Sequence, residues 1–158
     1  MNCKVDAFKL SDWDEIEPRE ELKVSLEHLK RDVVYEEVYQ KGMPFFTCRI
    51  DGKVIAIYGM LYGGEGTYMP SVLVCKDVHK YMKTLVKLFY GYFATYVPRT
   101  CRRMEAYCDI MDKKAIRLAK HFGFEPVGIR HYASPEGHDQ VIMERLCCCD
   151  SRKVRKVR

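Results

Sequence analysis

The sequence lacks the features that mark membrane, secreted and fibrous proteins. No run of 18 apolar residues occurs, so we expect no transmembrane segment. The first 15 residues, MNCKVDAFKLSDWDE, carry acids where a signal peptide needs an apolar core. Ten glycines and six prolines among 158 residues are too few for a collagenous or low-complexity chain. We therefore expect a cytoplasmic globular protein, and its length predicts one domain.

The eight cysteines lack the spacing of a disulfide scaffold or a zinc site. Five stand singly inside apolar segments, and three are consecutive at 147–149. We interpret them as reduced, mostly buried small hydrophobes and expect no metal. A zinc site formed by the triplet with His131 or His138 is the alternative, although no C-x-x-C or H-x-x-x-H spacing is present. A weaker alternative is palmitoylation of the cysteine triplet.

The net charge of +5 lies entirely in the last eight residues, SRKVRKVR. Five of the 27 basic residues stand there, which leaves 22 basic and 22 acidic residues in positions 1–150. We therefore expect a neutral domain over 1–146, followed at 147–158 by the cysteine triplet and a basic tail. Such a tail predicts at most a weak, salt-dependent contact with nucleic acid.

The N-terminal third predicts one strand and two helices. Residues 3–8 alternate well enough for a short strand. Ser11, with Asp14 three residues later, predicts a capping box for a short helix that Pro18 ends. Apolar residues then recur at helical spacing, which predicts an amphipathic helix over 19–39.

The middle of the chain predicts three antiparallel strands. Asp51-Gly52 is the strongest hairpin signal in the sequence and joins two expected strands, 45–50 and 53–62. A glycine-rich turn leads into a strand over 67–75, where Pro70 predicts a bulge or an unpaired position.

The remaining elements alternate between helix and strand. Asp77 is the expected N-cap of a helix that Pro98 closes, and Gly123 is the expected C′ residue of a later helix from about 112 to 122. The strands of this region are expected at 102–108, 125–132 and 139–146. The predicted fold class is α/β: one domain with four helices and a mixed, mostly antiparallel sheet of about seven strands.

One segment carries a family resemblance. AIRLAKHFGF at 115–124, followed by EPVG, resembles the fourth-helix motif of the GNAT superfamily of acyl-CoA-dependent N-acetyltransferases. The order of elements over 3–146 resembles the same family. The resemblance implies acetyl-CoA as cofactor and an amine as acceptor. Short members with few glycines also resemble internal virion proteins of podovirus-type bacteriophages, which would place the chain in a host cytoplasm or a virion.

The resemblance implies a cofactor site with clear departures from the family. Its phosphate-binding loop corresponds here to 75–85, which has no glycine, so Lys80 and Lys83 are the candidates for holding phosphates. An Asn that touches the pantetheine arm in the family corresponds to Asp112. The strand that lines the thioester corresponds to Val72, Leu73 and Val74.

The catalytic residues depart from the family as well. A Tyr that acts as general acid corresponds to Ala119, and no Glu, Asp or His occurs in 67–75 to act as base. Tyr107, Asp109 and Tyr132 fall near the expected opening of the sheet and are the candidate catalytic residues. Two functions stay open: an N-acetyltransferase that acts on an amine, and an inactive GNAT-fold protein that binds a protein partner, for example a phage virion or host-interaction protein.

Overall fold

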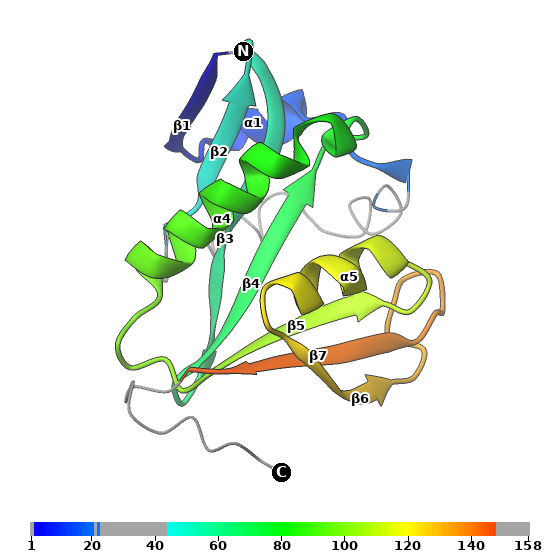
Figure 1. The fold of residues 1–158 in the computed structure, drawn as a ribbon. Helices are drawn as coiled ribbons and strands as arrows, with labels where there is room; N and C mark the ends of the chain where they lie inside the picture. The colour runs from blue at the N-terminus through cyan, green and yellow to red at the C-terminus, as the bar shows by residue number, and fades with distance from the viewer. Residues whose placement is uncertain (1, 21, 23–43, 148–158) are drawn as a thin grey trace.

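The computed structural model describes residues 2–20, 22 and 44–147 and shows one seven-stranded sheet (Figure 1). The strand order is β1-β2-β3-β4-β5-β7-β6, and every neighbouring pair is antiparallel except β4 and β5. This confirms the predicted α/β class and sheet. The strands are β1 (Cys3–Ala7), β2 (Phe46–Ile50), β3 (Lys53–Gly64), β4 (Thr67–Val74), β5 (Arg103–Asp109), β6 (Glu125–Arg130) and β7 (Gln140–Leu146).

The sheet opens between its only parallel neighbours. Strands β4 and β5 pair at two positions, Thr67 with Arg103 and Tyr68 with Met104, and then diverge as a V (Figure 1). Pro70 lies two residues beyond the last pair and stays in register with Met60 of β3. Of the two predicted alternatives at Pro70, the bulge is wrong, since the irregularity of this hairpin lies between Tyr62 and Gly64, whereas Pro70 is unpaired on its β5 side. A proline offers no N–H to a neighbouring strand, which suits the point of divergence.

Three α-helices lie within the described residues: α1 (Leu10–Glu15), α4 (Met82–Tyr96) and α5 (Lys113–His121). The helix predicted over 19–39 falls mainly on residues outside the described part. Helical structure begins directly after Asp77, as predicted, but its first turn is 3₁₀ and not α, and the Asp77 side chain makes no cap hydrogen bond. Residues Val78–Tyr81 form the 3₁₀ helix η1 before α4 begins, and Asp77 precedes η1.

The cap predicted for the first helix is also wrong. Helix α1 begins after Lys9, whose N–H donates to the Asp12 carboxylate at 2.9 Å, and Ser11 lies inside the helix. Asp12 is fully buried. Its carboxylate is compensated there by hydrogen bonds that it accepts from the Thr47 hydroxyl at 2.6 Å and from Arg49 at 2.7 Å. These contacts with β2 hold α1 against one face of the sheet.

Helix α4 covers the opposite face of the same strands. Phe46 of β2 packs edge-on against Tyr92 of α4, and Tyr58 of β3 packs against Phe89 and Tyr92. Since Phe46 and Thr47 are consecutive in a strand, their side chains point to opposite faces, which places α1 and α4 on opposite sides. Helix α4 lies on the same side of the sheet as α5 (Figure 1).

The C-terminal elements agree with the local signals in the sequence. Helix α5 ends before Gly123, which adopts a φ of +79°, as expected for a C′ glycine. Strands β6 and β7 form the predicted final hairpin. Cys147 follows β7, and its Sγ lies 3.0 Å from that of Cys101. The division at residue 146 stays a prediction, because the tail lies outside the described residues.

No helix in the described part of the chain combines the length and the apolar character needed to cross a membrane. The six described cysteines are free thiols. In the predicted alternative zinc site, His131 or His138 would join the cysteine triplet, of which Cys148 and Cys149 lie outside the described residues. Both histidines instead contact carboxylates, Asp139 and Asp109 respectively, each at 3.0 Å.

Candidate functional site

A cavity of about 560 Å³ lies where β4 and β5 separate, within the range of about 300–1,000 Å³ typical of small-molecule sites. Four consecutive residues of β5, 106–109, line it. Neighbouring residues of a strand point to opposite faces of a sheet, so the cavity passes through the opening from one face to the other. Two reactants could therefore enter from opposite sides and meet between the strands.

The helix side of the cavity combines small residues with apolar rings. Ala115, Leu118 and Ala119 of α5 line it, and Phe89 and Phe93 of α4 lie across from them. Ala119 stands where the resemblance implies a tyrosine, so this wall has space in place of a hydroxyl. These side chains form an apolar channel that suits a long, uncharged part of a ligand.

The opposite side of the cavity holds an aspartate–histidine pair. Asp109 is the last residue of β5, and its Oδ1 accepts the Met111 N–H at 2.8 Å. Its Oδ2 lies 3.0 Å from Nδ1 of His138, in the loop between β6 and β7. A protonated Nδ1 donates to the carboxylate, which leaves Nε2 able to accept a proton.

The loop that carries His138 is held by hydrogen bonds at both ends. The His138 N–H donates to the Ser134 hydroxyl at 2.9 Å, and the Ser134 N–H donates back to the His138 carbonyl at 3.1 Å. The Ile110 N–H donates to the Asp139 carbonyl at 2.9 Å, which joins this loop to the end of β5. Ser134 is itself buried and lines the cavity. The histidine is therefore positioned before any substrate arrives.

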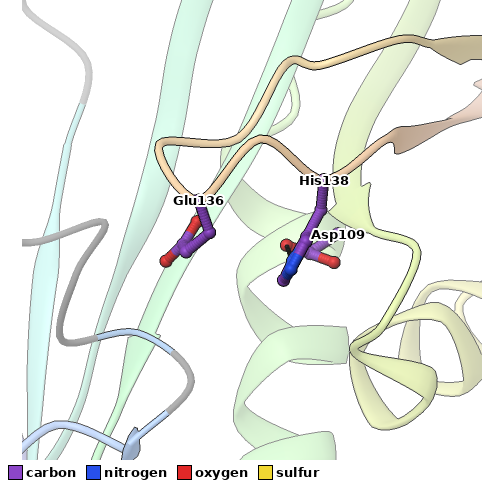
Figure 2. A group of neighbouring side chains, drawn as sticks. All are labelled: Asp109, Glu136 and His138. Atoms are coloured by element: carbon purple, nitrogen blue, oxygen red, sulfur yellow. Dashed lines mark hydrogen bonds and ion pairs between the residues drawn. The ribbon is translucent and has the colours of Figure 1, made fainter.

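Glu136 completes this group (Figure 2). Its carboxylate and the ligand atoms of Asp109 and His138 lie within 4.8 Å of one another, and all three residues line the cavity. Within the described residues, this is the one group of three or more such side chains with the spacing of a cation site. A group of two acids and one imidazole can bind an ammonium ion and accept a proton from it.

The predicted catalytic residues are placed unequally. Tyr107 and Asp109 line the cavity, whereas Tyr132 does not and is 84% exposed, in a turn with a φ of +49°. The Tyr107 hydroxyl donates to Glu105 at 2.8 Å, and this hydrogen bond raises the pKa of Tyr107 above its usual value. Its proton is thus already engaged with Glu105.

The predicted cofactor residues are also divided. Val72 is exposed and lines the cavity, whereas Leu73 and Val74 are buried and do not. Asp112 lines the cavity as the N-cap of α5, where it accepts the Ala115 N–H at 3.0 Å. It also forms an ion pair with Arg19 at 3.3 Å.

Burial raises the pKa of the neighbouring thiol of Cys108 to about 11, and Asp112 adds to this effect. This thiol therefore stays protonated at neutral pH.

Lys80 and Lys83 lie away from the cavity. Both are exposed, and Lys80 forms an ion pair with Asp77 at 3.2 Å. Neither lines the opening between β4 and β5. Their predicted role in phosphate binding stays a prediction.

His138 and Glu136 are members of the site that were not predicted from the sequence. A sequence signal was nevertheless present, because both residues stand in the polar turn directly before the last strand. Because the strand order places β7 beside β5, that turn lies at the end of β5.

Comparison with known proteins gives matches at the level of structure only. No protein-family model matches the sequence, and no curated protein is similar to it in sequence. The structure is similar to Ard1 from Thermoplasma volcanium, with a TM-score of 0.74 and 12% identity over 94% of this chain and 99% of the other. It is also similar to the ribosomal-protein-S18-alanine N-acetyltransferase from Escherichia coli, with a TM-score of 0.73 and 12% identity over 96% and 99%.

A third similar structure contains a ligand. It is a GNAT-superfamily phosphinothricin acetyltransferase from Sinorhizobium meliloti in complex with AcCoA, with a TM-score of 0.66 and 14% identity over 97% of this chain and 92% of the other. None of these three structures is described as a bacteriophage protein, so the resemblance to virion proteins has no support here. These TM-scores, each over 92% or more of both chains, lead to one conclusion: the chain has the fold of the GNAT-superfamily N-acetyltransferases.

Proposed function

We propose that the chain is an N-acyltransferase that moves an acyl group, acetyl in the simplest case, from a thioester to an amine. The observation that carries the proposal is the Asp109–His138 pair, held at 3.0 Å on the wall of a cavity that passes through the sheet. The GNAT fold of the chain supports this reaction class.

The two sides of the cavity suit the two substrates. The channel along α4 and α5 is apolar and suits the thioester arm, whereas Asp109 and Glu136 provide negative charge that attracts an ammonium ion. An ammonium must lose a proton before its nitrogen can attack a carbonyl. Nε2 of His138 accepts that proton while Asp109 stabilises the resulting imidazolium.

A matched pair of histidines tests this role. His131 and His138 stand in the same connection, and each has its Nδ1 at 3.0 Å from an aspartate oxygen. Only His138 lines the cavity. We expect His138→Gln to lower kcat/KM by a factor of roughly 10²–10⁴, the usual contribution of a general base, and His131→Gln to change it less than twofold.

The assay follows acetylation of the amine by mass spectrometry, with acetyl-CoA as the donor. Spermidine and a peptide that begins with alanine serve as acceptors, one a small polycation and the other a protein-like N-terminus. Equal losses in the two variants, or none in His138→Gln, would contradict the assigned base. A metal role for the group around Asp109 predicts loss of activity with EDTA, whereas the proposal predicts none.

The second candidate is a GNAT-fold protein that binds its ligand without catalysis. Ala119 favours it, because that position offers no proton to a departing thiolate. Binding of acetyl-CoA with no acetylated product from a broad panel of amines would favour this candidate over the transferase.

A further inference from the structure

The charge that lines the cavity is unusual for a site that binds a nucleotide. Among the described lining residues none is Lys or Arg, whereas four carry carboxylates: Glu20, Asp109, Asp112 and Glu136. One of the four, Asp112, is neutralised by its ion pair with Arg19. Residues 1–150 as a whole are neutral, with 22 basic and 22 acidic residues. The electrostatic potential of this wall therefore repels phosphate groups and attracts amines.

Several backbone amides at the helix start that follows β4 already have partners within the protein. Helix N-termini bind phosphates through backbone N–H groups that have no partner within the protein. Here the N–H of Cys75 donates to the Ile55 carbonyl and that of Lys76 to the Glu17 carbonyl, each at 2.9 Å. The N–H groups of Val78 and Lys80 donate to carbonyls within the turn, each at 3.1 Å. Four of the amides in this short stretch are thus already used.

The side chains around this helix start bring acids together with the lysines. Lys76 pairs with Glu17 at 2.8 Å, and Lys80 pairs with Asp77 at 3.2 Å. The hydrogen bond from Lys76 lowers the pKa of Glu17, so this acid stays charged near neutral pH. A diphosphate placed here would meet Glu17 and Asp77 as well as the lysines. Lys83 forms no ion pair with the residues that the structure describes, but it does not line the cavity.

The channel itself has what a pantetheine arm requires. Beyond the last β4–β5 pair, the two strands no longer pair with each other, and Ser71 and Ala106 line the opening with small side chains. A pantetheine arm carries two amides that can hydrogen-bond to such a strand edge. The residues thus fit the arm of acetyl-CoA and do not fit its nucleotide.

From this difference, and resting on the proposed function, we propose that the cleft recognises its donor through the acyl-pantetheine arm alone. Acyl thioesters of pantetheine without the adenine nucleotide are then donors as good as acetyl-CoA. In the reaction the amine nitrogen attacks the thioester carbonyl carbon, the C–N bond forms and the C–S bond breaks. Nε2 of His138 takes the proton that the ammonium loses before the attack, and the second proton of the attacking nitrogen passes through water to the departing pantetheine thiolate.

The test compares three donors on the wild-type protein with one acceptor. The donors are acetyl-CoA, S-acetyl-pantetheine and an acetylated acyl carrier protein, which distinguishes a free arm from one attached to a protein. We expect kcat/KM for S-acetyl-pantetheine within tenfold of the value for acetyl-CoA. A larger preference for acetyl-CoA would overturn the proposal. If the carrier protein is the better donor by more than tenfold, the arm is delivered by a protein, which still supports recognition of the arm alone.

Binding gives a readout that does not depend on catalysis. Calorimetry with CoA and with pantetheine should give dissociation constants within tenfold of each other, whether or not any amine is acetylated. The double variant Lys80→Ala/Lys83→Ala should bind CoA within about twofold of the wild type. A selective loss of CoA binding in this variant, or no binding of pantetheine at all, would overturn the proposal. Binding of both without turnover would instead count against the proposed function.

Discussion

The change of Asp12 to alanine removes the carboxylate that joins α1 to β2. Asp12 is 1% exposed and accepts hydrogen bonds from the Lys9 N–H, the Thr47 hydroxyl and Arg49. Without it, the fully buried Thr47 hydroxyl loses its acceptor and the first turn of α1 loses its cap. Arg49 keeps a partner, since it also donates to Glu15 at 2.9 Å. The cost therefore comes from hydrogen bonds and not from an isolated charge.

The size of the effect follows from these contacts. An unsatisfied buried hydroxyl costs about 1–3 kcal/mol, and the loss of a helix cap about 1 kcal/mol. We expect Asp12→Ala to lower the free energy of unfolding by about 2–4 kcal/mol, a large part of the roughly 5–15 kcal/mol of a typical domain. For a chain of this length the thermal midpoint should fall by roughly 5–15 °C.

Differential scanning calorimetry of two variants in the same helix provides the measurement and its control. Ser11→Ala should shift the midpoint by no more than about 2 °C, because Ser11 is exposed and lies inside α1, not at its N-cap. If Asp12→Ala melts within 2 °C of the wild type, or if Ser11→Ala costs as much as Asp12→Ala, the assigned cap and buried network are incorrect.

The difference in stability between the wild type and Asp12→Ala depends on pH with a definite sign. Burial by itself raises the pKa of Asp12, but the hydrogen bonds from Arg49, Thr47 and Lys9 outweigh it, so the folded pKa lies below 3.8. The unfolded chain therefore binds its proton at a higher pH than the folded chain does. The stabilisation is complete above the unfolded value of 3.8 and is lost as the pH falls through the folded pKa. The gap between wild type and Asp12→Ala should thus be constant near neutral pH and narrow below pH 3.8.

Two further predictions concern the cysteines and the tail. At pH 8 iodoacetamide should leave Cys48 and Cys108 of the native protein unmodified, because burial raises their pKa to about 12 and about 11; after denaturation all eight thiols should react, and fewer would indicate a disulfide or a bound metal. Removal of residues 151–158 should leave the thermal midpoint within about 1 °C. The same truncation should abolish retention on immobilised nucleic acid at low salt, and unchanged retention would contradict the predicted role of the tail.

Signals within a few residues predicted much of the fold. The pair Asp51-Gly52 forms its hairpin with both residues at positive φ, and Gly123 ends α5 as expected. These features depend on local backbone preferences, which the sequence shows directly. The cap of α1 was predicted incorrectly because the residues that hydrogen-bond to Asp12, Thr47 and Arg49, lie more than 30 positions away along the chain. No local pattern indicates that partnership.

The candidate site was predicted only in part, because its residues also come from distant parts of the sequence. Asp109, which directly follows the strand predicted at 102–108, was expected near the opening of the sheet. Its partner His138 lies 29 positions further along, and the two meet only because β7 inserts between β5 and β6. Strand order within a sheet depends on the packing of the whole domain. A turn histidine therefore has no visible partner until that order is known.

The most direct test of the account is whether the opening between β4 and β5 binds an acyl-pantetheine arm. Ser71 is exposed and lines this opening, so Ser71→Trp should fill it without disturbing the core. Calorimetric titration with S-acetyl-pantetheine should show one site per chain in the wild type and none in Ser71→Trp, with both proteins melting within about 2 °C of each other, as expected for an exposed position. Failure of the wild type to bind, or equal binding by both proteins, would contradict the assignment of this cleft as the donor site.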